Sequence, residues 1–199
     1  MDGTPNPQET PAWRTRGYLP HIDRPGLIQM VTWRLADSMS AERRRDWELL
    51  MNHPELAESR RKIQAYLDLG YGNCWLQNPA VAQVIQELLV AQDGIPYKLY
   101  AWVIMPNHVH VLVETMPGNS LGTIVKKWKG ASARICNQLL GRTGEFWYRE
   151  YYDRYIRDSD HFARAVQYIH ENPVVAGLVK LAAEWPWSSA ARLLPERAE

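Results

Sequence analysis

The chain has few cysteines, no long apolar run and almost no net charge. Its two cysteines, Cys74 and Cys136, provide neither a disulfide framework nor the ligand spacing of a zinc site, and they suit the reduced thiols of a cytoplasmic protein. The first thirty residues are polar and proline-rich, and they lack the apolar core of a signal peptide. No apolar run is long enough to cross a bilayer. We therefore expect a cytoplasmic protein that has no membrane partner.

The net charge of +1 is unevenly distributed, because a basic and aromatic region lies between Lys126 and Arg157. Eight basic residues there outnumber three acidic ones, and seven aromatic residues lie among them. This composition is typical of nucleic-acid binding, since cations neutralise phosphates and aromatic rings stack on bases. It is also typical of a solvated helix face followed by an aromatic strand. The candidate phosphate contacts are Lys126, Lys127, Lys129, Arg134, Arg154 and Arg157, and the candidate base-stacking residues are Trp147 and Tyr148.

Apolar periodicity and turn residues predict the order of the secondary-structure elements. We predict strands at 27–36, 97–105 and 108–114, helices at 79–92 and 120–140, one or two short strands within 145–157, and a helix from Ser159 that Pro173 ends. The last prediction follows because the residue before a proline is pushed out of helical geometry. Two further helices, separated by Pro54, are expected within residues 40–69.

This order predicts an α+β fold of the ferredoxin-like split βαβ type. The fold would have a central antiparallel sheet with helices on one face and the functional site on the other. Residues 40–76 would be a helical insertion into it. We expect a single domain at 13–190, which ends in a C-terminal segment at 174–190. A disordered tail at 1–12 precedes this domain and a second tail at 191–199 follows it.

The sequence PNHVHVLVE places two histidines, His108 and His110, on the same face of a strand. Residues at this spacing lie about 6.6 Å apart, and imidazole nitrogens about 2.1 Å from one ion can bridge that gap. Glu114 is about 13 Å further along the strand, too far to be a third ligand. Two alternatives stay open at this point: a pair of surface histidines on an open sheet face, and a histidine-triad nucleotide hydrolase. The second alternative requires a third histidine where this chain has Leu112.

A complement to this pair lies in the sequence QYIHEN, where Tyr168 and Asn172 project from one face of a helix. The amide oxygen of Asn172 can complete a site for a hard divalent ion, and the phenol of Tyr168 can attack a phosphorus atom bound there. Spacing alone leaves Tyr168 equally consistent with a half-buried core tyrosine, and His170 can replace Asn172 as ligand. The competing nucleophiles are Tyr148, Tyr151, Tyr152 and Tyr155.

Several longer motifs, in this order, resemble the single-tyrosine HUH transposases and, more closely, the REP-associated tyrosine transposases of bacteria. They are RGYLPHIDRPGLIQMVTWRLADS, PNHVH followed by VLVE, SLGTIVKKWKG, FWYREYYDRYIRD, YIHENPVVAGLV and WPWSS. The resemblance covers residues 13–190, which is nearly the whole chain.

The resemblance implies a function and a set of site residues. The HUH pair of the family corresponds to His108 and His110, its nucleophile to Tyr168, and its third metal ligand, often glutamine in insertion-sequence enzymes, to Asn172. It implies an enzyme, dependent on Mg²⁺ or Mn²⁺, that cuts single-stranded DNA near hairpins and leaves a 5′-phosphotyrosine and a 3′-hydroxyl. It also implies a bacterial protein that is associated with the nucleoid when bound to DNA and is a monomer or a homodimer. A DNA hairpin-binding protein that has lost catalysis is the alternative.

Overall fold

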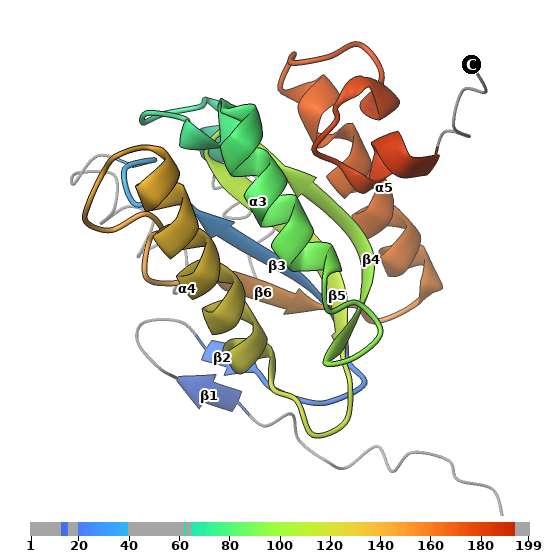
Figure 1. The fold of residues 1–199 in the computed structure, drawn as a ribbon. Coiled ribbons are helices and arrows are strands. Elements are labelled where there is room, and N and C mark those ends of the chain that lie inside the picture. Colours follow the sequence, from blue (N-terminus) through green and yellow to red (C-terminus); the bar gives the residue numbers. More distant parts are fainter. Residues whose placement is uncertain (1–12, 16–19, 40–61, 63–64, 194–199) are drawn as a thin grey trace, which may run out of the picture.

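The computed structural model describes residues 13–15, 20–39, 62 and 65–193. The predicted tail at 1–12 and most of the two helices expected within residues 40–69 lie outside these ranges. The core is a four-stranded antiparallel sheet in the order β4-β5-β3-β6 (Figure 1). Its strands are β3 (Ile28–Arg34), β4 (Tyr97–Ile104), β5 (His108–Thr115) and β6 (Tyr152–Tyr155). A separate two-stranded sheet pairs β1 (Trp13–Thr15) with β2 (Pro20–Ile22).

The helices alternate with the strands as the sequence predicts. Helix α3 (Pro79–Val90) separates β3 from β4, α4 (Leu121–Leu139) separates β5 from β6, and α5 (Ser159–Val175) follows β6. Each helix begins at a side-chain cap, with Asn78, Ser120 and Asp158 accepting backbone N–H groups of α3, α4 and α5 respectively. The strand order matches the ferredoxin-like split βαβ arrangement, and the predicted α+β fold is confirmed.

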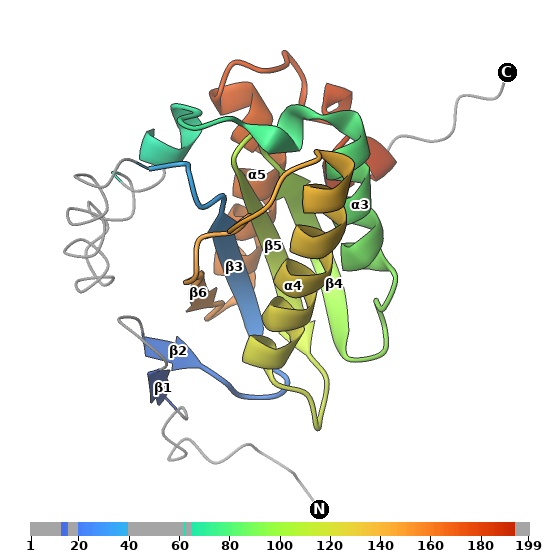
Figure 2. The same ribbon diagram turned by 60° about the vertical axis from the view of Figure 1, so that its left-hand side comes forward.

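Both faces of the sheet are covered by helices (Figures 1 and 2). Helices α3 and α4 pack on one face, against a core that includes Val109, Val111 and Val113 of β5. Helix α5 packs on the other face, where Ile169 contacts the side of the sheet that carries Leu112. The expectation of an open sheet face around the histidines is therefore wrong, because the second face is a second hydrophobic core.

Helix α5 also corrects the prediction that Pro173 ends it, since the helix continues to Val175. A proline lacks the N–H that would bond to the carbonyl of Ile169, so it removes one helical hydrogen bond. The surrounding bonds persist: Ala176 N donates to Asn172 O at 3.0 Å and Leu178 N donates to Pro173 O at 2.9 Å. Pro173 itself is buried, and its packing stabilises the helix against the loss of that one bond.

The C-terminal segment after α5 covers the outer edge of β4. Ile104 N donates to Trp187 O at 2.8 Å, and the indole N–H of Trp185 donates to Ile104 O at 2.9 Å. Two residues earlier on β4, Trp102 N donates to Ser189 Oγ at 3.1 Å. Residues 182–184 and 189–193 form the short 3₁₀ helices η2 (Ala182–Glu184) and η3 (Ser189–Leu193). No helix in the part of the chain that the structure describes is both long and apolar enough to cross a membrane.

Candidate functional site

The histidine pair lies on β5, on the sheet face that α5 covers. The strand register places His110 between Thr32 of β3 and Val103 of β4, and His108 beside Arg34. His108 is 0% and His110 is 1% exposed, and their ring centroids are 4.7 Å apart. The alternative of two surface histidines is therefore wrong.

Hydrogen bonds to the Nδ1 atoms orient both rings. His108 Nδ1 lies 2.7 Å from Asn107 Oδ1, and the Asn107 amide is itself fixed because its Nδ2 donates to Tyr71 O at 3.2 Å. His110 Nδ1 lies 2.7 Å from Thr32 Oγ1. We assign the tautomer of each ring from this network, with Nδ1 as donor. Each Nε2 then carries a lone pair, and this is the arrangement that metal-binding histidines adopt.

Helix α5 brings Tyr168 and Asn172 to the same place. The Tyr168 hydroxyl lies 3.5 Å from His110 Nε2, and the two rings are 5.4 Å apart and nearly perpendicular. Asn172, one helical turn later, is 3% exposed and hydrogen-bonds to the Tyr168 phenol. Two atoms of the site, His108 Nε2 and Asn172 Oδ1, are buried without a hydrogen-bond partner among the described residues. Buried polar atoms are rarely left in this state, so these two atoms point to an absent ligand.

Burial also sets the protonation of the site. It lowers the pKa of His108 well below its ordinary value, with a further decrease from the neighbouring His110, and it lowers the pKa of His110 to about 3. Both rings are therefore neutral at physiological pH, as metal ligands must be. Burial raises the pKa of Tyr168, the carboxylate of Asp68 raises it further, and the hydrogen bond from Asn172 opposes this increase. The phenol is therefore protonated unless a cation shares the site.

The donor set fits a divalent cation. Two imidazole nitrogens and an amide oxygen leave coordination positions open for water or a phosphate oxygen, as Mg²⁺ and Mn²⁺ require. Among the described residues, no three His, Cys, Asp or Glu side chains form a metal cluster by themselves. The amide oxygen of Asn172, which is buried without a hydrogen-bond partner among the described residues, is the group that could serve as a third ligand. His170 cannot take its place here, because its Nε2 lies 2.9 Å from Ser189 Oγ in the C-terminal segment.

The competing tyrosines occupy other surroundings. The ring of Tyr148 lies under the Arg34 guanidinium at 3.7 Å, and that of Tyr151 stacks on His21 at 4.1 Å. Tyr155 pairs with Gln29, which puts it on the opposite sheet face from His110. Tyr152 pairs with Thr32, so it shares the face of His110 with one strand between them. The geometry therefore favours Tyr168 as the nucleophile.

The predicted nucleic-acid contacts do not form one group. Lys126, Lys127, Arg134 and Arg157 are exposed, as phosphate contacts would be. Arg154 pairs with Met30 on β6, on the same sheet face as Leu112 and the histidine pair.

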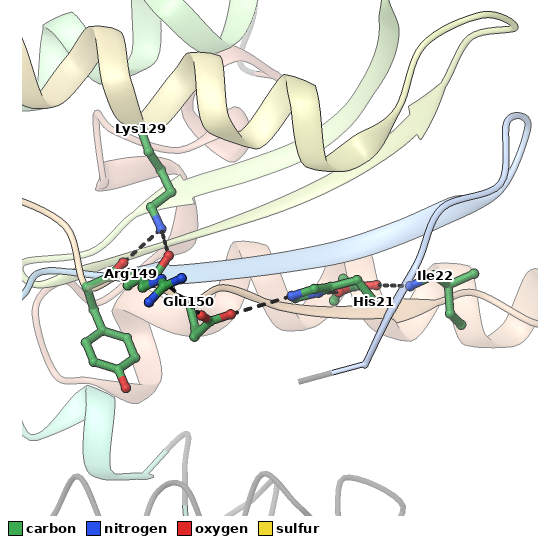
Figure 3. Close-up of polar contacts among 7 residues, drawn as sticks. His21, Ile22, Lys129, Arg149 and Glu150 are labelled. Atoms are coloured by element: carbon green, nitrogen blue, oxygen red, sulfur yellow. Dashed lines mark hydrogen bonds and ion pairs between the residues drawn. The ribbon is translucent and has the colours of Figure 1, made fainter. Parts of the chain in front are cut away.

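Lys129 and Trp147 have structural surroundings instead. The Lys129 ammonium donates to the carbonyls of Tyr148 and Arg149 at 2.8 and 2.7 Å (Figure 3). Trp147 is 6% exposed, and its indole N–H donates to Ser132 Oγ at 2.9 Å within the core under α4. The rings of Trp33 and Phe146 lie edge-on to Trp147 in this core, and its burial disfavours the predicted stacking on a base.

The segment around these residues borders a groove of about 650 Å³ between α4 and residues 144–151. The imidazole of His21 lines this groove, pairing through Nδ1 with Asp153 and through Nε2 with Glu150 at 3.7 Å (Figure 3). Ile22 N donates to the second oxygen of Asp153 at 3.2 Å, so β2 is fastened to β6. The mixed charges of the lining, Lys126 and Arg149 against Glu145 and Glu150, make it no dedicated anion site.

Three residues at the site are absent from the sequence-based prediction: Asp68, Thr32 and Asn107. Asp68 Oδ1 lies 4.0 Å from His108 Nε2. Asn107 stands directly before the histidine motif, so its position was a usable signal. Thr32 and Asp68 reach the site only through strand pairing and chain folding, which local sequence does not reveal.

The sequence is similar to those of known transposases. The family model described as transposase IS200-like matches residues 74–172. A REP-associated tyrosine transposase of Escherichia coli (strain K12) is 28% identical over 96 residues, which cover 47% of this chain and 54% of that protein. A relative in Haemophilus influenzae is 28% identical over 108 residues, which cover 49% of this chain and 61% of that protein. The chain thus spans between about half and three-fifths of the length of these curated relatives.

The fold is similar to a solved structure of a REP-associated tyrosine transposase bound to a REP hairpin. The TM-score is 0.57 at 20% sequence identity, and the match covers 88% of this chain and 86% of that chain. The family match contains the histidine pair together with Tyr168 and Asn172. Residues 74–172 therefore match the IS200-like transposase family, and the chain is similar to the REP-associated tyrosine transposases.

Proposed function

We propose that this protein nicks single-stranded DNA and transfers the strand in a metal-dependent reaction that passes through a 5′-phosphotyrosine. One observation carries the proposal: the Tyr168 hydroxyl lies 3.5 Å from His110 Nε2, beside His108 Nε2 and Asn172 Oδ1, two buried acceptors that have no hydrogen-bond partner within the described part of the chain. The substrate is hairpin-forming, REP-like palindromic DNA, and the reaction is a step of DNA transposition. The names of the E. coli relative and of the structural neighbour support this choice.

His108, His110 and Asn172 would hold Mg²⁺ or Mn²⁺, which, when bound, polarises a phosphate oxygen as a Lewis acid. The oxygen of Tyr168 attacks the phosphorus; its bond to phosphorus forms as the bond from phosphorus to the 3′ oxygen breaks. The phenol proton leaves and the 3′ oxygen is protonated, so the products are a 5′-phosphotyrosine and a free 3′-hydroxyl. One phosphodiester is exchanged for another, and the reverse attack by a 3′-hydroxyl therefore rejoins strands.

The chain supplies positioning through the rigid elements on which the site is built. Tyr168 and Asn172 lie on one face of α5, and both histidines lie on a central strand whose hydrogen bonds are made on both sides. The exposed cations Lys126, Lys127 and Arg134 of α4, with Arg157 before α5, contact DNA phosphates.

The test is a covalent adduct between the protein and a single-stranded palindrome labelled at its 3′ end, formed in Mg²⁺ or Mn²⁺ and separated under denaturing conditions, because the 5′-phosphotyrosine retains the 3′ part of the cut strand. We expect an adduct with the wild type, none in EDTA, and a loss of at least about 10³-fold in Tyr168→Phe. Tyr155→Phe, which changes an exposed tyrosine of β6, is the matched control and should form the adduct normally.

An adduct that survives in Tyr168→Phe would show that the nucleophile is assigned wrongly. Tight hairpin binding by the wild type without any adduct would instead support the second candidate, a catalytically inactive DNA hairpin-binding protein.

A further inference from the structure

Asp68 lies beside the histidine pair although no motif and no family match includes it. Its carboxylate oxygen is 4.0 Å from His108 Nε2, and its side chain is 18% exposed. This distance is too long for a direct hydrogen bond. The tautomer that Asn107 fixes puts a lone pair on Nε2, so two acceptors face each other across this gap.

Two acceptors in this position repel each other unless something positive lies between them. The other groups at the site, His108, His110 and Asn172, are neutral ligands. A divalent charge surrounded by neutral ligands in a buried site is poorly stabilised, and one nearby carboxylate offsets that cost.

Buried and stacked neighbours hold the backbone around Asp68 in place. Leu67 is buried next to it, and the rings of Tyr66 and Tyr71 stack 5.1 Å apart. Gly72 sits in the left-handed region at φ 91°, where a Cβ would lie 2.8 Å from the carbonyl oxygen of Asp37; only glycine fits that approach.

The same segment also contacts the Nδ1 side of His108, through Asn107. The carbonyl of Tyr71 accepts from Asn107 Nδ2, and Asn107 Oδ1 in turn holds His108 Nδ1. Residues 68–71 therefore orient the His108 ring through one nitrogen and place a carboxylate opposite the other. This double contact is typical of the outer groups that tune a metal site.

We propose that Asp68 is a cation-binding residue of this site, supplying the negative charge that the two histidines and Asn172 lack. It acts on the ion through one of the waters that Mg²⁺ and Mn²⁺ keep. Among the described residues no three His, Cys, Asp or Glu side chains are placed to hold a metal together, so Asp68 lies outside the three ligands and is not one of them. The inference rests on the proposed metal-dependent function.

The test measures Mn²⁺ binding to the full chain without DNA, by the loss of the free Mn²⁺ signal in electron paramagnetic resonance and by calorimetry. We expect Asp68→Asn to weaken Mn²⁺ binding by at least about tenfold and Asp68→Glu, which keeps the charge, to stay within about threefold of the wild type. Asp160→Asn, an equivalent change on the exposed first turn of α5, is the matched control and should bind like the wild type. Thermal unfolding in EDTA reports whether each variant is folded.

The outcomes separate this inference from the proposed function. If His110→Ala abolishes Mn²⁺ binding but Asp68→Asn binds as tightly as the wild type, the metal site stands and the role of Asp68 is refuted. If Asp68→Asn and Asp68→Glu are weakened equally, Asp68 has a structural role and the inference also fails. If the wild type binds no Mn²⁺, or binds it equally well without His110, the metal site and this inference fail together.

Discussion

The buried polar groups on the two faces of the central sheet differ in how they are hydrogen-bonded. Under α4, polar groups are linked in pairs: Trp147 Nε1 donates to Ser132 Oγ, Trp128 Nε1 donates to the Tyr97 hydroxyl, and that hydroxyl donates to Leu89 O. Under α5, His108 Nε2 and Asn172 Oδ1 are buried and have no such partner among the residues that the structure describes. Trp33 Nε1 and Gln29 Oε1 are exceptions on the α4 side of the sheet. An unpartnered buried acceptor costs free energy, so we infer that the α4 face is organised for stability and the α5 face for binding.

The largest effect that tests this contrast is expected at Trp147. Trp147→Ala should lower the free energy of unfolding by about 3–5 kcal/mol, because it empties part of the core beside Trp33 and leaves Ser132 Oγ without a donor. Urea unfolding followed by tryptophan fluorescence and circular dichroism measures the change. Tyr148→Ala, at the half-exposed neighbouring position, is the control and should lose less. A fully stable Trp147→Ala variant with weakened DNA binding would restore the base-stacking role.

Lys129 gives the next largest effect, as a dependence of stability on pH. Burial lowers its pKa to about 8, against the opposing effect of Glu150, and Arg34 adds to the decrease. Between about pH 8 and its ordinary pKa near 10.4, the unfolded chain binds more protons than the folded chain. The free energy of unfolding should therefore rise with pH in that window, by at most about 3 kcal/mol from this group.

The measurement is a series of urea titrations from pH 7 to 10.5 on the wild type and Lys129→Met. The difference between the two curves isolates Lys129 from the tyrosines that titrate nearby. A difference that is flat across the window would show that Lys129 is well solvated in the folded protein.

A pair of asparagines offers a smaller but more direct comparison of the two faces. Asn172→Leu removes an Oδ1 acceptor that has no partner among the described residues, together with one hydrogen bond to the Tyr168 phenol, so its effect on the free energy of unfolding without metal should stay within about 1 kcal/mol. Asn137→Leu, on α4, breaks bonds to Gly144 O and from Arg142, and should destabilise by about 1–2 kcal/mol. Mn²⁺ affinity should show the reverse order, with a loss of at least about tenfold only in Asn172→Leu. Equal stability losses in both variants would contradict the proposed difference between the α4 and α5 faces.

The smallest effect on stability is expected at Lys126, which is exposed on α4. Lys126→Ala should change the free energy of unfolding by no more than about 0.5 kcal/mol. If the side chain contacts a phosphate, the slope of log affinity for hairpin DNA against log salt concentration should fall by about 1. Fluorescence anisotropy at several salt concentrations measures that slope. Lys180→Ala, which changes an exposed lysine outside α4, is the control. An equal change of slope in that variant would show that the loss of one positive charge explains the effect without a direct phosphate contact at Lys126.

The sequence predicts the parts of this molecule that local patterns determine. The order of strands and helices follows from apolar spacing and from caps such as Ser120, and the alternation along β5 separates His108 and His110 from Val109 and Val111. The i and i+4 spacing of Tyr168 and Asn172 likewise places both on one face of α5. These relations involve residues within about one turn or one hairpin of each other.

The incorrect and missing predictions all depend on contacts between distant segments. Pro173 stays helical because it is packed in the core, which overrides its local preference. The burial of His110 follows from α5, 58 positions later in the chain. Asp68 meets His108 through a segment whose sequence has no pattern related to the site. Periodicity carries no information about such packing.

The covered edge of β4 has a consequence for assembly. An edge strand with free N–H and C=O groups is the usual place where another chain adds a strand and two molecules join through a continuous sheet. In this chain Ile104 and Trp102 already use those groups to bind Trp187, Trp185 and Ser189 of their own molecule. A second copy could extend the sheet at this part of β4 only by displacing residues 185–189, so a homodimer that keeps these bonds would have to form elsewhere than at residues 102–104.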